Sequence, residues 1–184
     1  MIVGAILTQN TAWTNVEKAI KNLKREQVLS PAKMQALEVN KLAALIRPAG
    51  YFNVKAKRLK NFLTHLFSNH NASLTKFFKA ETNGLRKELL DINGIGPETA
   101  DSILLYAARR PVFVVDAYTK RILTRHALAG ETTSYHQIQA IFTDNLKEDE
   151  KLFNEYHALI VRVAKEYCKS RNPQCCNCPL EKFL

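Results

Sequence analysis

Cysteine is absent from most of this 184-residue chain, and all four cysteines fall in one short segment near its end, at Cys168, Cys175, Cys176 and Cys178. A disulfide framework would distribute cysteines so that they join distant parts of the chain. The clustering instead favours a metal ion or an iron-sulfur cluster held by the terminal segment.

Long apolar runs are also absent. No run approaches the ~18 to 20 residues that a membrane-spanning helix needs. The opening stretch "MIVGAILTQN" lacks the basic start and the small-residue cleavage pattern of a signal peptide. We therefore expect a soluble, cytoplasmic protein.

Acidic residues are few relative to basic ones, with 17 aspartates and glutamates against 27 lysines and arginines, which gives a net charge of +10. A balance of this sign favours polyanionic partners such as nucleic acid. The alternative is a basic surface that serves only solubility, and charge alone does not separate the two.

Sustained period-two alternation is absent, whereas helix signals recur throughout, so an all-α protein is predicted. A capping box of Thr14 and Glu17 predicts a helix start near Asn15. In the segment that begins at Asn53, apolar residues alternate at helical spacing with lysines, which are expected on an outward basic face. We expect helices near residues 53–67, 74–78, 99–108, 117–126, 134–145 and 152–165, and a domain boundary near Pro111.

The stretch "LRKELLDINGIGPETADSILLYA" has the pattern of two helices joined by a tight glycine corner. Gly94 and Gly96 permit positive φ angles and a close approach of the backbone to a ligand. The backbone N–H groups at the start of the second helix can hold a DNA phosphate. The alternative is an ordinary glycine turn.

Asp116 follows this hairpin in "RRPVFVVDAYTKRIL" and stands directly before a predicted helix. Aspartate is a favoured N-cap residue, and many such residues do nothing else. Its position after a glycine hairpin and a proline-containing loop favours a functional carboxylate.

These motifs together resemble the endonuclease III branch of the helix-hairpin-helix DNA glycosylases, named for the hairpin, a Gly/Pro-rich loop and an aspartate. The resemblance implies two helical subdomains that flank a DNA-binding cleft. Residues 1–111 would form a barrel-like domain with the hairpin, without the family's first helix, and residues 112–184 a C-terminal helical domain. A monomer that binds double-stranded DNA containing a damaged base is expected.

Family members flip a base out of the duplex and break its bond to deoxyribose. The resemblance makes Asp116 the catalytic carboxylate, which suits a cation-like transition state on the sugar. Strand-cleaving members have a nucleophilic lysine where this chain has Glu98, and a carboxylate cannot form their Schiff base. A monofunctional glycosylase of base-excision repair is therefore expected.

Two loops resemble the family's DNA-contact loops. "ILTQNTAW" places Gln9 where a glutamine fills the gap left by the flipped nucleotide, and "AGYFN" makes Tyr51 the candidate wedge beside the estranged base. Asn53 and Thr99 complete the predicted DNA contacts with the two hairpin glycines. From the residues alone, Gln9 could equally be a surface amide and Tyr51 a half-buried packing residue.

Trp13 is the single tryptophan, and one tryptophan in a helical protein most often lies in the core. The 3-methyladenine DNA glycosylase branch, however, has an aromatic at this position that stacks on the flipped base, and it also has a glutamate at the position of Glu98. The resemblance therefore places Trp13 and Glu98 in a pocket for an alkylated purine such as 3-methyladenine. A mismatch glycosylase is the alternative substrate class.

The terminal cysteines resemble the family's [4Fe-4S] loop. Cys168, Cys175 and Cys178 match its first three ligands, but Leu184 stands where the fourth is expected. Since four thiolates are the usual requirement for such a cluster, three alternatives stay open: a lost cluster, a chain that continues beyond this point, or a zinc site.

Two further functions stay open. A helix-hairpin-helix protein could bind DNA without breaking any bond, and a bifunctional glycosylase/lyase could use another amine, such as Lys120, in place of the missing lysine. The five histidines show no paired metal spacing, and the sequence assigns them no role.

Overall fold

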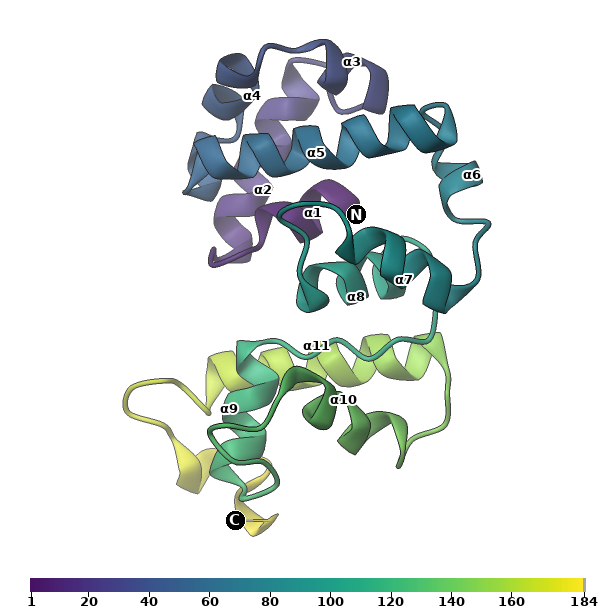
Figure 1. The fold of residues 1–184 in the computed structure, drawn as a ribbon. Coiled ribbons are helices and arrows are strands. Elements are labelled where there is room, and N and C mark those ends of the chain that lie inside the picture. The colour runs from purple at the N-terminus through teal and green to yellow at the C-terminus, as the bar shows by residue number, and fades with distance from the viewer. Residues whose placement is uncertain (184) are drawn as a thin grey trace. The chain divides into compact units, whose positions relative to one another are not determined.

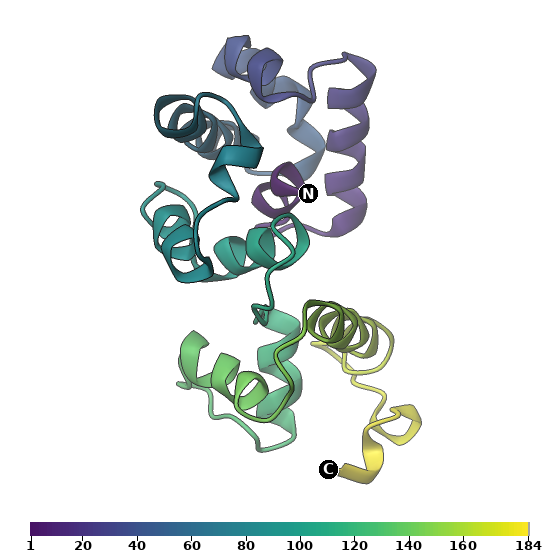
Figure 2. The same ribbon diagram turned by 90° about the vertical axis from the view of Figure 1, so that its right-hand side faces the viewer.

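The computed structural model describes residues 1–183, which contain eleven α-helices, three short 3-10 helices and no strand. The predicted all-α class is confirmed. The chain divides into two compact units, Met1–Ala108 and the segment from Arg109 onward (Figures 1 and 2).

The first unit holds eight α-helices of very different lengths. They are α1 (Ile2–Leu7), α2 (Trp13–Arg25), α3 (Pro31–Ala36), α4 (Val39–Leu45), α5 (Phe52–His70), α6 (Leu74–Phe77), α7 (Thr82–Leu90) and α8 (Pro97–Tyr106), with the 3-10 helix η1 (Arg47–Ala49) before α5. The second unit holds α9 (Ala117–Arg125), α10 (Tyr135–Thr143) and α11 (Glu150–Glu166), followed by η2 (Cys175–Asn177) and η3 (Glu181–Phe183). No helix in the described part of the chain is long and apolar enough to cross a membrane.

The long helix α5 runs across the first unit (Figure 1) and packs against α1, α3, α4 and α6. Leu59, Phe62 and Leu66 recur at helical spacing and are buried, as the apolar stripe predicts. The predicted outward face of lysines is wrong at Lys55, which is only 1 % exposed, whereas Val54 is 49 % exposed. Helix α5 therefore turns a lysine toward the core.

Helix α2 begins two residues earlier than predicted, at Trp13, with Ala12 as its N-cap and no side-chain cap. The expected capping box of Thr14 and Glu17 is wrong, because Glu17 Oε1 accepts a hydrogen bond of 3.0 Å from Trp13 Nε1. The Glu17 carboxylate is thus bonded to the indole of Trp13 and not to a backbone N–H group at the helix start.

The second unit is built on stacked phenylalanines. The Phe113 ring stacks on that of Phe142 with centroids 3.8 Å apart, and Phe153 meets Phe113 edge-on. Phe113 lies in the extended segment that leads to Asp116, so this aromatic core fixes the chain just before α9. A second cluster of Ile122, Ala164 and Cys168 joins α9 to α11.

Candidate active site

The predicted hairpin is present, with α7 and α8 joined by residues 91–96. Gly94 has a φ of 95°, and an added Cβ would lie 2.9 Å from Arg58 Cδ and closer still to Arg58 Cγ. Gly96 differs from the prediction of a positive φ, since its φ is −97°. An added Cβ at Gly96 would meet nothing within 4 Å. Only Gly94 is required for the turn itself.

The start of α8 lacks a side-chain cap. Gly96 is its N-cap residue and offers no side chain, and Pro97 occupies the first turn. The first N–H groups of a helix have no intrahelical partner and carry a partial positive charge. This terminus therefore has the local chemistry of an anion-binding site.

A buried ion pair fixes the two hairpin helices. Arg86 on α7 donates to both carboxylate oxygens of Asp101 on α8, from Nε at 2.7 Å and from the second nitrogen at 3.1 Å. Asp101 is fully buried, and breaking such a bidentate pair would leave an uncompensated charge. The ion pair therefore joins the two helices of the hairpin to each other.

Gln9 is joined to the hairpin and is not a free surface amide. Its Nε2 donates to Gly94 O at 3.0 Å and to Thr99 Oγ1 at 2.8 Å, and its Oε1 accepts from Arg58. Three residues predicted to contact DNA, namely Gln9, Gly94 and Thr99, are thus brought together within the first unit. Thr99 is 5 % exposed and serves here as an anchor for Gln9.

Lys55 connects the loop that carries Gln9 with the loop that carries Tyr51. Its Nζ donates to Leu7 O at 2.9 Å, Thr11 Oγ1 at 2.7 Å and Ala49 O at 2.7 Å. Thr11 Oγ1 in turn donates to Ala49 O at 2.5 Å. Burial, helped by the nearby Arg58 charge, lowers the pKa of Lys55 to about 8.

Tyr51 stands at the exposed tip of the second loop. It is 72 % exposed and has the left-handed backbone angles φ 44° and ψ 33°, directly after Gly50 at φ 66°. A bulky residue rarely adopts such angles, and strain of this kind concentrates at functional positions. Asn53, two residues later on α5, is also exposed.

Trp13 is not a core residue, since it is 46 % exposed. One edge of its ring lies over Gly4, where an added Cβ would approach Trp13 Cη2 to 3.3 Å. The absence of a side chain on Gly4 therefore makes room for the ring. Glu98, in the first turn of α8, is exposed as well.

Asp116 caps α9, as the simpler interpretation predicts. Its Oδ1 accepts hydrogen bonds from Thr119 N at 2.7 Å and Thr119 Oγ1 at 2.9 Å. Its Oδ2 lies 3.5 Å from Nε2 of His157 on α11. The two oxygens of this carboxylate are thus held differently.

His157 is the neighbour that the sequence did not reveal. Burial by itself would raise the pKa of Asp116, but the interaction with His157 and the hydrogen bonds from Thr119 outweigh it and hold this pKa below the ordinary value. The carboxylate therefore stays anionic at neutral pH while 14 % of its side chain is exposed.

The terminal cysteine segment belongs to the second unit and is joined to α9 through Arg125. Cys168 is buried, and its Sγ accepts a hydrogen bond of 3.2 Å from Arg125, whereas Cys175 and Cys176 are exposed and Cys178 is partly exposed. Position 184 lies outside the described residues, and its leucine side chain has no ligand atom. Cys168, Cys175 and Cys178, which match the first three ligands that the resemblance calls for, are thus all described, and the [4Fe-4S] cluster stays a prediction.

The comparison with known families matches residues 3–148 to the HhH-GPD superfamily of base excision DNA repair proteins. The chain belongs to this superfamily. A Methanocaldococcus jannaschii protein assigned as a DNA repair glycosylase is 50% identical over 184 residues, covering 100% of this chain and 83% of that protein. The protein is accordingly a DNA repair glycosylase, an N-glycosylase, and the resemblance inferred from its motifs is confirmed.

Two solved structures illustrate the likeness. The 3-methyladenine DNA glycosylase of H. pylori, bound to 1,N6-ethenoadenine, matches with a TM-score of 0.77 and 32% identity, covering 90% of this chain and 83% of that one. A non-covalent endonuclease III–DNA complex matches with a TM-score of 0.84 and 22% identity, over 99% and 80% of the two chains. The second likeness concerns the fold alone.

Proposed function

We propose that this glycosylase is monofunctional: it hydrolyses the N-glycosidic bond of a flipped, alkylated purine and leaves an abasic site. The observation that carries the proposal is Asp116, an anionic carboxylate with one oxygen fixed by Thr119 and the other facing a partly open environment beside His157. Bond cleavage builds positive charge on the sugar, which an adjacent carboxylate stabilises while it orients a water molecule.

The absence of lyase chemistry rests on Glu98. A Schiff base needs an uncharged amine as the nucleophile, and Glu98 supplies a carboxylate at the position where the strand-cleaving relatives have lysine. Lys120 is the amine that would have to replace it under the bifunctional alternative.

The substrate class rests on Trp13. Its ring is 46 % exposed in a helical protein where a lone tryptophan would normally be buried. Alkylation gives several purines a positive charge, and a cation gains ~2 kcal/mol or more on an electron-rich ring when water is excluded. The 3-methyladenine DNA glycosylase of H. pylori, at 32% identity, supports the same class.

The remaining candidates provide DNA contacts. Gln9, held by the hairpin, would fill the gap in the duplex, and the exposed Tyr51 would wedge beside the estranged base, with Asn53 close to it on α5. The Gly96 corner and the uncapped start of α8 would bind a phosphate.

Release of free base from methylated duplex DNA tests the function directly. Wild-type protein should release 3-methyladenine, and Asp116→Asn should lower the single-turnover rate by about 10²- to 10⁴-fold while it retains duplex affinity. Asparagine is also a good N-cap, so α9 should stay folded. Equal rates for the two proteins would contradict the mechanism, and no release from any lesion by either protein would favour a DNA-binding role alone.

Borohydride reduction distinguishes a monofunctional glycosylase from the bifunctional alternative, because it traps the Schiff base of a lyase as a covalent adduct. We expect no covalent protein–DNA adduct with wild-type protein. An adduct that disappears in Lys120→Gln would establish the lyase instead.

A further inference from the structure

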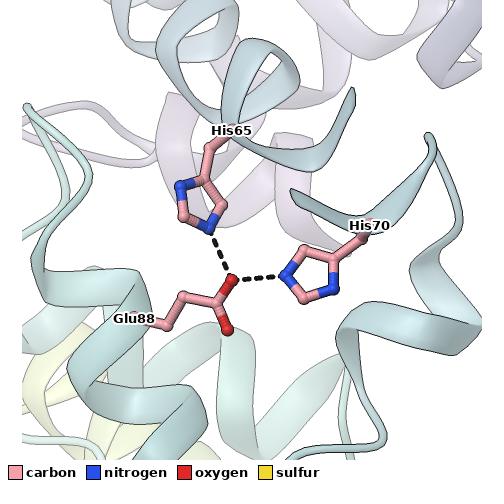
Figure 3. A group of neighbouring side chains, drawn as sticks. All are labelled: His65, His70 and Glu88. Atoms are coloured by element: carbon pink, nitrogen blue, oxygen red, sulfur yellow. Dashed lines mark hydrogen bonds and ion pairs between the residues drawn. The ribbon is translucent and has the colours of Figure 1, made fainter. Parts of the chain in front are cut away.

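Two histidines and a glutamate converge within the first unit (Figure 3). His65 and His70 come from the last turns of α5, and Glu88 comes from α7. Nε2 of His65 lies 2.6 Å from Glu88 Oε1, and Nε2 of His70 forms a hydrogen bond with the same oxygen. The three ligand atoms all lie within 4.8 Å of one another, and no other such group of three occurs among residues 1–183.

The spacing of the two histidines explains why the sequence did not reveal this group. Metal-binding histidines on one helix face are usually three or four residues apart, whereas these are five apart. His70 is the last residue of α5, and Asn71 then reverses the chain with a φ of 52°. The termination of the helix, not its periodicity, lets the two rings meet.

Packing holds both rings in place. Phe77, which is fully buried, meets His70 edge-on with ring centroids 5.1 Å apart and His65 at 6.3 Å. The side chains of the three ligand residues are between 17% and 24% exposed, so an ion and a water molecule can reach them. The two rings are thus held beside Glu88 while all three side chains stay partly accessible.

The donor set is two imidazole nitrogens and one carboxylate oxygen, which is a known set for a zinc ion with one open position. Without a metal, both imidazoles share a single carboxylate oxygen as their hydrogen-bond partner. A divalent ion would instead bind all three donors at once. Imidazole ligands favour zinc and its transition-metal neighbours over magnesium or calcium.

We propose that His65, His70 and Glu88 form a Zn²⁺ site that fastens the end of α5 to α7, the first helix of the hairpin. Two other residues along α5 already contact this region. Asn61 Nδ2 donates to Asn93 O at 2.9 Å, and Arg58 lies against Gly94. The zinc ion would add a third link at the far end of the same helix.

Asn69 would support the site from behind. Its Nδ2 lies 3.1 Å from Nδ1 of His65. When Nε2 of His65 binds the metal, Nδ1 of the ring carries the proton. If the Asn69 amide group is rotated by half a turn, its oxygen can accept a hydrogen bond from this Nδ1–H group. The orientation of such an amide is an assignment from the hydrogen-bond network. Outer partners of this type commonly change metal affinity by about 10- to 100-fold.

Zinc content of the purified full chain, after equilibration with Zn²⁺ and gel filtration, tests the site. Glu88→Gln, His65→Gln and His70→Gln should each lose one equivalent relative to wild type. His136→Gln, which changes an exposed histidine outside the cluster, should lose none. Any zinc on the terminal cysteines is the same in all five proteins and cancels in the difference.

Two further readouts keep the test decisive if a variant fails to fold. The imidazole resonances of His65 and His70 should shift on addition of Zn²⁺ to wild-type protein, and Asn69→Ala should bind that ion about 10- to 100-fold more weakly. Unchanged zinc content in the Glu88→Gln protein, or imidazole resonances that do not respond to Zn²⁺, would show a metal-free hydrogen-bonded cluster and overturn the proposal.

Discussion

Asp116 uses its two carboxylate oxygens for different purposes. Oδ1 caps α9 through Thr119, so the residue is structural in the ordinary sense. Oδ2 faces His157, 3.5 Å away. An N-cap aspartate can therefore also be a functional carboxylate, because capping occupies only one oxygen.

His157→Gln tests this arrangement through the pH dependence of base release. Under the proposed mechanism Asp116 acts as an anion, so activity should be present above its pKa and should be lost as the pH falls through it. Since His157 helps to hold this pKa below its ordinary value, its removal should move the acidic limb of the single-turnover rate to higher pH. His136→Gln is the matched control. An acidic limb that stays in place would show that His157 does not tune the carboxylate.

Alanine substitution of the two hairpin glycines should have different effects on stability. Gly94→Ala should lower the free energy of unfolding by about 1–3 kcal/mol, because alanine would be forced to a positive φ and against Arg58. Gly96→Ala should leave stability nearly unchanged, yet weaken duplex binding if the backbone meets a phosphate there. Urea unfolding and duplex titration of both variants measure the contrast, and equal stability losses would contradict it.

Helix α5 shows most clearly what the sequence can and cannot predict at the scale of elements. The apolar period placed Leu59, Phe62 and Leu66 in the core correctly, since burial follows helical spacing. The same period could not reveal that Lys55 is buried, because none of its three acceptors belongs to α5. They are the carbonyl oxygens of Leu7 and Ala49 and the hydroxyl oxygen of Thr11. A local pattern contains no information about such partners.

Lys55→Met should destabilise the first unit by about 1–3 kcal/mol, because the acceptors on Leu7, Thr11 and Ala49 would lose their donor. The two loops that carry Gln9 and Tyr51 should also loosen and bind duplex DNA more weakly. Lys57→Met, on the exposed side of the same helix, should change unfolding little. Equal unfolding midpoints in urea for the two variants would contradict this role.

The same lysine predicts a pH dependence. Its pKa is lowered from 10.5 to about 8 in the folded protein, so between these values the unfolded chain binds more protons. The free energy of unfolding of wild type, relative to Lys55→Met, should therefore rise as the pH increases from about 8 to 10.5. A stability difference that is flat over this range would show that the pKa is not lowered.

The candidate site was predicted unevenly for a related reason. Gly94 and Asp116 could be singled out as candidates because each belongs to a motif of neighbouring residues. His157 and the group of His65, His70 and Glu88 could not, because their members meet only after α11, α5 and α7 have packed. The Thr14–Glu17 capping box was wrong because α2 begins at Trp13, which places Thr14 inside the helix, and Glu17 instead accepts from Trp13.

At the scale of the whole molecule, a net charge of +10 agrees with a DNA substrate. Each phosphate that the protein neutralises should add about 0.9 to the slope of log affinity against log salt. We expect duplex affinity to fall by more than ~10-fold between 50 mM and 200 mM salt, as two or more contacts require. Fluorescence anisotropy measures this slope, and affinity that is independent of salt would contradict phosphate recognition.

The most direct test of monofunctional hydrolysis compares abasic sites and strand breaks on one methylated duplex. After reaction with wild-type protein, we predict that the strand remains intact and breaks only on alkaline treatment, in proportion to the base released. Strand breaks that match the released base before alkali would contradict the account, because they would require the lyase chemistry that Glu98 cannot supply.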